Sequence, residues 1–389
     1  MRHLNLFYTA LHNITRYPVR SMVIILCLIA ILLPFLSAMA VLEGVKKESF
    51  ISAQDGADVY LTMDMYGRNG VIPIDMAEPV RNIEGVIRVM PRAISRIYVG
   101  GKLTVLLGIP IEGLTGKVTF VKGGLPKEGE VVIGRRLARE MKLDIGDSLS
   151  LGVRIIGIVD HVPYVVKREF RISGIFDSSS GLWTSNLILM NLNEMIGLYE
   201  MDGFITDMAI YVRPGLTGKV SEELQRMNSY FRIQTKDLVM TYLDRGFSTK
   251  GGIFLILYTI AFAIGIPALL VSSGLGLTER KREVGILKAL GWRTVDVMEM
   301  VFFECLILSL LSVPMTFIIS FFWIKVLNAP FIAQIFIPGA GIFPDFPVPS
   351  LFLPMPLIIT FLISIVITAT GSIYTTWRTS VVPPVEAMR

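Results

Sequence analysis

Residues 21–42 have the sequence SMVIILCLIAILLPFLSAMAVL, a run of 22 positions without a charged side chain. A helix needs about 20 apolar residues to cross the hydrocarbon core of a bilayer, which is roughly 30 Å thick. Three later stretches, residues 251–277, 301–324 and 351–377, meet the same length requirement. Because lipid offers the backbone no hydrogen-bond partner, each stretch is expected to be helical. The sequence therefore predicts four transmembrane α-helices.

The composition is divided between a membrane part and a soluble part. The chain has 389 residues, of which 52% are hydrophobic and 18% charged. Its mean hydropathy of +0.61 is too high for an ordinary soluble protein. Residues 43–250, however, hold 26 Lys or Arg and 25 Asp or Glu in 208 positions, close to the composition of a soluble domain. A large folded domain is therefore expected between the first and second helices, which gives a one-plus-three arrangement.

Residues 43–250 have the pattern of an α+β domain. Short runs rich in β-branched residues begin at Ala57, Leu103, Glu130, Phe170 and Met208, separated by Gly, Pro and Asp. Helical patterns follow Gly134, start at an N-cap Asn191 with Glu194 three positions on, and extend over residues 217–230. The fold class is thus a membrane protein with a large α+β extracytoplasmic domain.

The distribution of Lys and Arg predicts the orientation in the membrane. The predicted 325–350 loop offers only Lys325, and the basic residues near the outer ends of the first two spans weaken the asymmetry without reversing it. Residues 1–20, 278–300 and 378–389 are therefore expected in the cytoplasm, and residues 43–250 outside. Ten basic residues support this assignment: Arg2, Arg16, Arg20, Arg280, Lys281, Arg282, Lys288, Arg293, Arg378 and Arg389.

The leader before the first span has a helical pattern of its own. Leu4, Phe7, Tyr8, Leu11 and Ile14 recur at helical spacing, which indicates a helix that lies on the inner leaflet. A frayed leader is the alternative. A signal peptide cleaved after residues 38–40 is disfavoured, because the apolar run is longer than a signal h-region and the leader longer than a usual n-region.

The residue types that usually form active sites or metal sites show no catalytic or metal-binding pattern in this sequence. Cys27 and Cys305 lie in apolar runs, and the three histidines have no metal-ligand spacing. The tract of residues 178–180 is Ser-Ser-Ser, but His161 is the one histidine of residues 43–250. Glu304, at the start of the third span, is more typical of a membrane interface than of an active site. We therefore predict no catalytic residue and no metal site, and the charge distribution argues against nucleic-acid binding.

The 278–300 loop begins with TERKREVGILKALGW, residues 278–292. Val284, Leu287 and Leu290, with Ile286 beside them, form an apolar edge on a short helix that ends at Gly291. Such an edge suits a groove on another protein. A basic juxtamembrane helix held by anionic lipid is the alternative on pattern alone.

This loop resembles the signature E-R-x-x-E-(I/V)-G-x-x-x-A-x-G of the FtsX-like permeases, the family that includes the MacB and LolC/LolE transporters. Residues 130–151 and 170–178 are similar to the extracytoplasmic domain of MacB-type proteins, and residues 384–389 resemble the terminal P-x-E-A-(L/M)-R of the family. These matches, with the one-plus-three layout, span almost the whole chain. The loop residues that the resemblance assigns to ATPase coupling are Glu279, Arg280, Glu283, Val284, Gly285, Leu287, Ala289, Leu290 and Gly291.

The resemblance implies the transmembrane subunit of an ABC transporter in the cell (inner) membrane. Its expected partners are a separate ATPase subunit, a second permease copy or close homologue, membrane lipid and, in some systems, a periplasmic adaptor. ATP and Mg would be bound by the ATPase, since no phosphate-binding loop is found and MacB itself carries an ATPase domain that this sequence lacks before its first span. The chain itself is expected to be no enzyme and to hold no cofactor.

Two rival functions remain. FtsX-like proteins include relays that do not transport but control an external cell-wall hydrolase, although the size of the external domain favours the MacB/LolC type. A membrane-anchored enzyme would need a cluster of titratable groups near the membrane, where the sequence offers Glu304. The apolar 325–350 loop is expected to be external and interfacial, with a re-entrant loop as the alternative.

Overall fold

The computed structural model describes residues 2–111, 119–156, 163–177, 186–274, 284–337, 340–344 and 346–381. The chain divides into two compact units, which we call the helical unit (Met1–Val45 with Phe247–Arg389) and the sheet unit (Lys46–Gly246). Residues 278–283, 178–180, His161 and the C-terminal residues 384–389, all considered above, lie outside the described residues.

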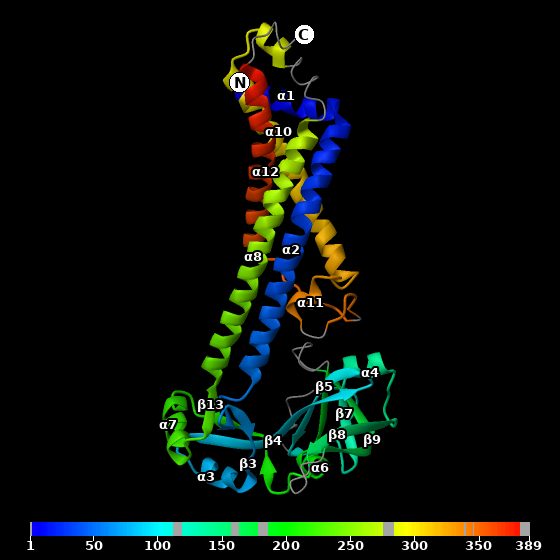
Figure 1. Ribbon diagram of the computed structural model, residues 1–389, viewed down its shortest axis with the longest axis vertical. Coiled ribbons are helices and arrows are strands. Elements are labelled where there is room, and N and C mark those ends of the chain that lie inside the picture. Colours follow the sequence, from blue (N-terminus) through cyan, green and yellow to red (C-terminus); the bar gives the residue numbers. More distant parts are fainter. Residues whose placement is uncertain are drawn as a thin grey trace. The chain divides into compact units, whose positions relative to one another are not determined.

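Long helices make up the helical unit (Figure 1). Two of them, α2 and α10, are long and apolar enough to cross a membrane, judged over the described residues. Helices α8 and α12 cover most of the other two predicted spans, and the apolar part of α12 is the shorter segment Pro354–Thr370. The helices are α1 (Arg2–Arg16), α2 (Pro18–Asp55), α8 (Lys236–Gly274), α10 (Thr294–Lys325), α11 (Ala333–Phe336) and α12 (Pro354–Val381).

Apolar side chains of three helices form the core of this unit. Ile24, Leu28 and Leu32 of α2 pack with Leu308 of α10 and Ile367 of α12. Leu28 and Leu32 are fully buried. The helices that the hydropathy pattern predicts separately therefore pack together through one shared cluster.

A seam of hydroxyl side chains runs between α10 and α12, which lie side by side (Figure 1). The Ser312 and Ser364 Oγ atoms are 3.4 Å apart, as are Ser309 Oγ and Thr368 Oγ1. Ser320 extends the seam to α2, where its Oγ lies 2.8 Å from Ser37 Oγ. Small side chains let helices in a membrane approach closely, and the Thr316, Thr360 and Thr368 hydroxyls also donate to backbone carbonyls of their own helices. The buried members of the seam are Ser37, Ser309, Ser312, Thr316, Ser320, Thr360, Ser364, Thr368, Ser372 and Thr376.

The connection between α10 and α12 packs against α2 and α8. The Leu351 amide donates to the Ala40 carbonyl at 2.8 Å, and the Lys250 ammonium donates to the Phe336 carbonyl at 3.4 Å. A side chain at Gly44 would collide with the backbone of Ser350, because a Cβ there would lie 2.4 Å from the Ser350 Cα. The connection is therefore held in place by a backbone hydrogen bond to α2 and by the Lys250 side chain of α8.

The sheet unit contains one large mixed sheet and a small two-stranded sheet, in agreement with the predicted α+β class. Neighbouring strands follow the order β13-β1-β12-β4-β5-β10-β7-β9-β6, with β2 beside β1 and β8 beside β9. The pairs β5–β10 and β7–β9 are parallel and the others antiparallel. The strands are β1 (Val59–Met65), β2 (Arg68–Gly70), β3 (Ile72–Pro73), β4 (Val86–Val99), β5 (Lys102–Ile109), β6 (Thr119–Gly123), β7 (Glu130–Gly134), β8 (Ser148–Ile156), β9 (Pro163–Asp177), β10 (Leu187–Asn191), β11 (Phe204–Ile205), β12 (Asp207–Val212) and β13 (Phe231–Thr235).

Strand β4 joins the two halves of the large sheet. Its residues up to Arg92 pair with β12, and its residues from Ala93 onward pair with β5. At the change of partner the Thr206 hydroxyl accepts from the Ile94 amide at 2.8 Å and lies 3.2 Å from the Arg92 carbonyl oxygen. Beside it, Arg92 donates two hydrogen bonds to the Asp207 carboxylate, at 2.8 and 2.7 Å. Side chains therefore make hydrogen bonds to the backbone of β4 where its pairing changes from β12 to β5.

Short helices cover the sheet: α3 (Ala77–Arg81), α4 (Arg135–Met141), α6 (Leu192–Tyr199) and α7 (Thr217–Met227). The strands predicted from Ala57, Leu103, Glu130, Phe170 and Met208 and the helices predicted at α4, α6 and α7 are confirmed. The Asn191 side chain caps α6 by accepting from the Asn193 amide at 3.2 Å. Glu194 does not complete the capping box, because it accepts a hydrogen bond from the Gly129 amide at 3.1 Å instead.

Candidate coupling site

We call residues 278–292 the coupling segment; the structure describes it from residue 284, and residues 284–289 form one short helix. It ends as a Schellman motif: the Gly291 amide donates to the Lys288 carbonyl at 3.0 Å, and the Trp292 amide donates to the Leu287 carbonyl at 3.1 Å. Gly291 has a φ of +92°, a conformation that glycine adopts without a steric penalty. The predicted end of the helix at Gly291 is confirmed, and Gly291 is the residue type that this ending requires.

Helix α10 starts directly after this turn. The Asp296 carboxylate accepts from the Arg293 amide at 3.1 Å, which satisfies one free amide at the helix start. A carboxylate in the first turn also interacts favourably with the helix dipole. Residues 284–296 thus form two helical segments joined by a tight turn.

The short helix has a buried face and an exposed face. Val284 is 3% exposed and Gly285 is buried, while Leu287 is half-buried. Leu290 is 73% exposed and Ile286 is 46% exposed. Ala289 and Gly291 are exposed as well. The apolar edge expected from the sequence is therefore divided between internal packing and a surface that a partner can reach.

Leu287 of the short helix packs on a cluster formed by α1 and α10. Its core holds Ala10 of α1 with Met300, Val301, Cys305 and Ile307 of α10. The side chains that pack around it are Phe7, Ile14, Leu287, Trp292 and Phe303. Three separate segments of the chain, the leader helix, the coupling segment and α10, thus share one apolar core.

Polar contacts also join α1 to α10. The His3 Nδ1 contacts Glu299 Oε1, and the Asn13 amide group donates to Glu304 Oε1. The Arg20 guanidinium lies 4.0 Å from Glu304 Oε2. Glu304 is 6% exposed, so this carboxylate is buried against α1.

The sequence predicted some of these residues and missed others. Glu279, Arg280 and Glu283 lie outside the described residues. A helix was predicted for the leader and α1 confirms it, but Leu4, Tyr8 and Leu11 are exposed while Leu6 and Ala10 are buried. The contact of the leader with the coupling segment was missed, and so was Trp292. No local pattern could have indicated the contact between the leader helix and the coupling segment, because these segments are far apart in the sequence.

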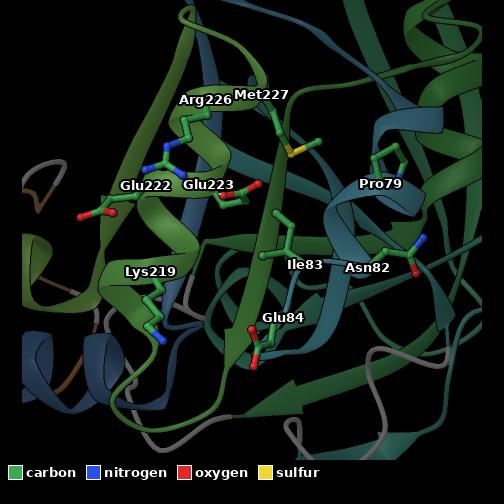
Figure 2. Close-up of a pocket in the computed structure, with 9 residues that line it drawn as sticks. All are labelled: Pro79, Asn82, Ile83, Glu84, Lys219, Glu222, Glu223, Arg226 and Met227. Atoms are coloured by element: carbon green, nitrogen blue, oxygen red, sulfur yellow. Dashed lines mark ion pairs between the residues drawn. The ribbon is translucent and has the colours of Figure 1, made fainter.

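An open hollow of about 640 Å³ lies between α3 and α7 in the sheet unit (Figure 2). Ile83 and Met227 line it together with Pro79. Its charged lining comes mainly from one face of α7, with Lys219, Glu222, Glu223 and Arg226. The lining residues include no Ser, Cys or His, the side chains that most often act as a nucleophile or a general base. We therefore centre the functional argument on the coupling segment.

Comparison with known proteins shows what the chain is similar to. Residues 249–384 match the family described as FtsX-like permease, C-terminal. The chain is 21% identical over 282 residues to the lipoprotein-releasing system transmembrane protein LolC of Xylella fastidiosa strain 9a5c, covering 70% of this chain and 68% of that protein. It is 26% identical over 152 residues to an uncharacterized ABC transporter permease of Methanocaldococcus jannaschii, covering 36% and 37% of the two chains.

Two solved structures are similar to part of the chain. The periplasmic region of MacB from Actinobacillus actinomycetemcomitans aligns with a TM-score of 0.36 and 14% identity, covering 49% of this chain and 95% of that one. The extracellular domain of the ABC-type transporter YknZ from Gram-positive bacteria aligns with a TM-score of 0.33 and 11% identity, covering 46% and 99%.

The family match over residues 249–384 is to a membrane permease domain, and α2 and α10 are long and apolar enough to cross a membrane, judged over the described residues. More particularly, residues 249–384 match an FtsX-like permease domain, and the chain is similar over 70% of its length to the transmembrane protein LolC.

Proposed function

We propose that this chain is the transmembrane subunit of a MacB/LolC-type ABC transporter, which passes ATP-driven motion from a separate ATPase to its external domain, residues 43–250. The motion would export or extract a substrate. The proposal includes four membrane spans, cytoplasmic termini and a second copy or close homologue of this chain. ATP and Mg would be bound by the ATPase, and a periplasmic adaptor and membrane lipid are further proposed partners.

The observation that carries this proposal is the exposed apolar side of an anchored short helix. Leu290 and Ile286 are exposed, while Val284 and Leu287 of the same helix pack inside the chain. Anchoring fixes the direction of the exposed side chains before any partner binds, which lowers the entropic cost of docking. Short helices with apolar anchors at such spacings commonly bind in grooves of partner proteins.

Force would reach the external domain along α2 and α8, the first and second predicted spans. Helix α2 continues to Asp55, and α8 begins at Lys236, so both extend beyond the predicted spans. The Lys46 ammonium of α2 and the Asp244 carboxylate of α8 are 2.7 Å apart. A pair of helices joined in this way is a stiffer link than two separate flexible connections.

Leu290→Asp tests the contact with the ATPase. Docking would place the new carboxylate in an apolar groove without a partner, which is strongly unfavourable. We expect the amount of ATPase that co-purifies from native membranes to fall roughly tenfold or more, since interface anchors typically contribute about 2 kcal/mol. Leu290 is 73% exposed, so the substitution leaves the internal packing of this chain intact.

Leu238→Asp is the matched control, because Leu238 is a partly exposed leucine on a helix of the sheet unit. This variant should retain the ATPase at the level of the parent protein. If Leu290→Asp and Ile286→Asp retain it as well, the proposed contact is wrong. Leu287→Asp is a less specific test, because Leu287 also packs on the cluster of α1 and α10.

A further inference from the structure

The polar contacts between α1 and α10 centre on one buried carboxylate. Glu304 of α10 is 6% exposed, and its Oε1 accepts a hydrogen bond from the Asn13 side chain of α1. Its Oε2 lies 4.0 Å from the guanidinium of Arg20, close to the start of α2. We call Asn13, Arg20 and Glu304 the Glu304 clamp. It joins α1, the start of α2 and α10 at a single side chain.

The clamp lies beside the apolar cluster that holds the coupling segment. Leu287 and Trp292 of that segment pack against Ala10, Met300 and neighbouring residues. Phe7 of α1 also meets Phe303 of α10 edge to face, with ring centroids 5.8 Å apart. A displacement of the coupling segment therefore pushes on a surface made by α1 and α10 together.

Burial makes the clamp a strong constraint. A buried carboxylate cannot exchange a lost partner for water, so moving α1 relative to α10 would remove the Asn13 hydrogen bond without replacement. An exposed ion pair imposes no such constraint, because water replaces the lost partner. His3 with Glu299 is an α1–α10 contact of the exposed kind, since the His3 side chain is 76% exposed.

We infer that α1 is part of the ATPase-coupling element, and that the Glu304 clamp makes α1 and α10 move as one body when the ATPase displaces the coupling segment. Asn13, Arg20 and Glu304 are positioning residues in this mechanism: they touch neither ATP nor substrate. The inference rests on the proposed function, because it presupposes that an ATPase docks on Leu290 and Ile286.

The test measures the movement of α10 in the assembled complex. Spin labels are placed at Ile253→Cys on α8 and Val326→Cys at the end of α10, both exposed, in a Cys27→Ala background; Cys305 is buried. Distance distributions are recorded by pulsed electron paramagnetic resonance, in lipid nanodiscs with the co-purified ATPase, without nucleotide and with ATP plus vanadate. The parent complex is expected to shift toward a second distance on addition of ATP plus vanadate.

Glu304→Gln and Asn13→Ala are expected to retain the ATPase and its basal hydrolysis. The ratio of shifted to unshifted conformers should fall roughly twofold to thirtyfold, the range in which mutations along a coupling network act. Asn13→Ala leaves Glu304 and Arg20 together, so it is the variant to measure if the Glu304→Gln protein does not accumulate in the membrane. His3→Ala removes the exposed α1–α10 contact and should leave the ratio as in the parent.

Each other outcome has a definite meaning. A full shift in Glu304→Gln or Asn13→Ala with the ATPase bound overturns the inference, as does an equal loss in His3→Ala. Loss of the ATPase from Asn13→Ala also overturns it, because the clamp would then form the docking surface instead of transmitting motion. If the parent complex binds no ATPase, the proposed function itself fails, and co-purification alone reveals this before any label is introduced.

Discussion

Gly44 in α2 lies against the backbone of Ser350, which leaves no room for a side chain. A Cβ at this position would be 2.4 Å from both the Cα and the amide nitrogen of Ser350, and backbone atoms cannot move aside as a flexible side chain can. We expect Gly44→Ala to lower the free energy of unfolding by about 1–3 kcal/mol, the usual cost of overpacking. The measurement is thermal unfolding of the purified protein in detergent.

Gly252→Ala in α8 is the matched control, because no heavy atom lies within 4 Å of a Cβ built there. Alanine is favoured over glycine in a helix by about 1 kcal/mol, so this variant should be as stable as the parent protein or more stable. Equal melting temperatures for the two variants would contradict the close approach of α2 to Ser350.

Arg92 and Asp207 form a buried ion pair in the sheet unit. Their side chains are 14% and 10% exposed, and the Arg92 guanidinium also lies 4.8 Å from the centroid of the Tyr60 ring. Burial by itself lowers the pKa of Arg92, but its hydrogen bond and charge interaction with Asp207 outweigh burial, and the pKa is raised. The guanidinium is therefore charged at every pH at which the protein is folded.

Arg92→Met should destabilise the sheet unit by about 3–5 kcal/mol, because the Asp207 carboxylate would remain buried without its partner. The double variant Arg92→Met with Asp207→Leu removes both charges and should recover most of that loss. Hydrogen exchange of the β4 and β12 amides in the full chain measures both effects. If the single and double variants exchange equally fast, the unpaired charge is not the cause.

At the scale of elements, the hydroxyl seam explains how α10 and α12 approach each other. Hydrophobic attraction does not drive two apolar helices together inside lipid, so small side chains and hydroxyl contacts replace it. On α12 the buried hydroxyl residues recur every four positions from Thr360 to Thr376, which places them on one face. The pairing of these two helices therefore depends on side-chain size more than on hydropathy.

Ser364→Leu should separate α12 from α10 and lower the free energy of unfolding by about 1–3 kcal/mol. Ser364→Ala should cost only about 0.6 kcal/mol, the average value of a hydrogen bond between membrane helices. Leu362→Ile is the control, because Leu362 is on the exposed side of α12 and its substitution changes a side-chain shape without changing the contact between α10 and α12. Thermal unfolding in detergent compares the three variants, and a harmless Ser364→Leu would refute the close packing.

At the scale of the whole molecule, the proposed topology places the coupling segment and the sheet unit on opposite sides of the membrane. Tyr66, in the turn between β1 and β2, is 88% exposed, and Leu290 is 73% exposed. A membrane-impermeant maleimide should label Tyr66→Cys but not Leu290→Cys in right-side-out vesicles. Inverted vesicles should give the reverse pattern. Labelling of both positions from the same side would overturn the topology and, with it, the proposed function.

The parts of the fold that local sequence predicts are those that depend on neighbouring residues. β7 was predicted from EVVIG because β-branched residues favour an extended backbone. The capping of α6 by Asn191 was predicted from a side chain and an amide two positions away. Glu194 shows the limit of such reasoning, because its partner is the Gly129 amide and no local pattern selects it.

The candidate site shows the same limit. The helix of residues 284–289 and its end at Gly291 were predictable, since a Schellman ending depends on adjacent residues. The exposure of Leu290 and the burial of Val284 were not predictable, because they depend on which neighbouring segments cover the helix. Both side chains are apolar, so their chemistry does not distinguish them.

By itself the sequence determined the long apolar helices, the charged domain between the first two and the helix that ends at Gly291. Hydropathy, charge and helix endings are properties of residues that lie close together in the chain. Only the tertiary structure decided which side of that segment is exposed, and that Glu304 is buried against Asn13 and Arg20. The physical reason is that burial is a relation between segments brought together by packing, and α1 and α10 are distant in sequence but adjacent in the fold.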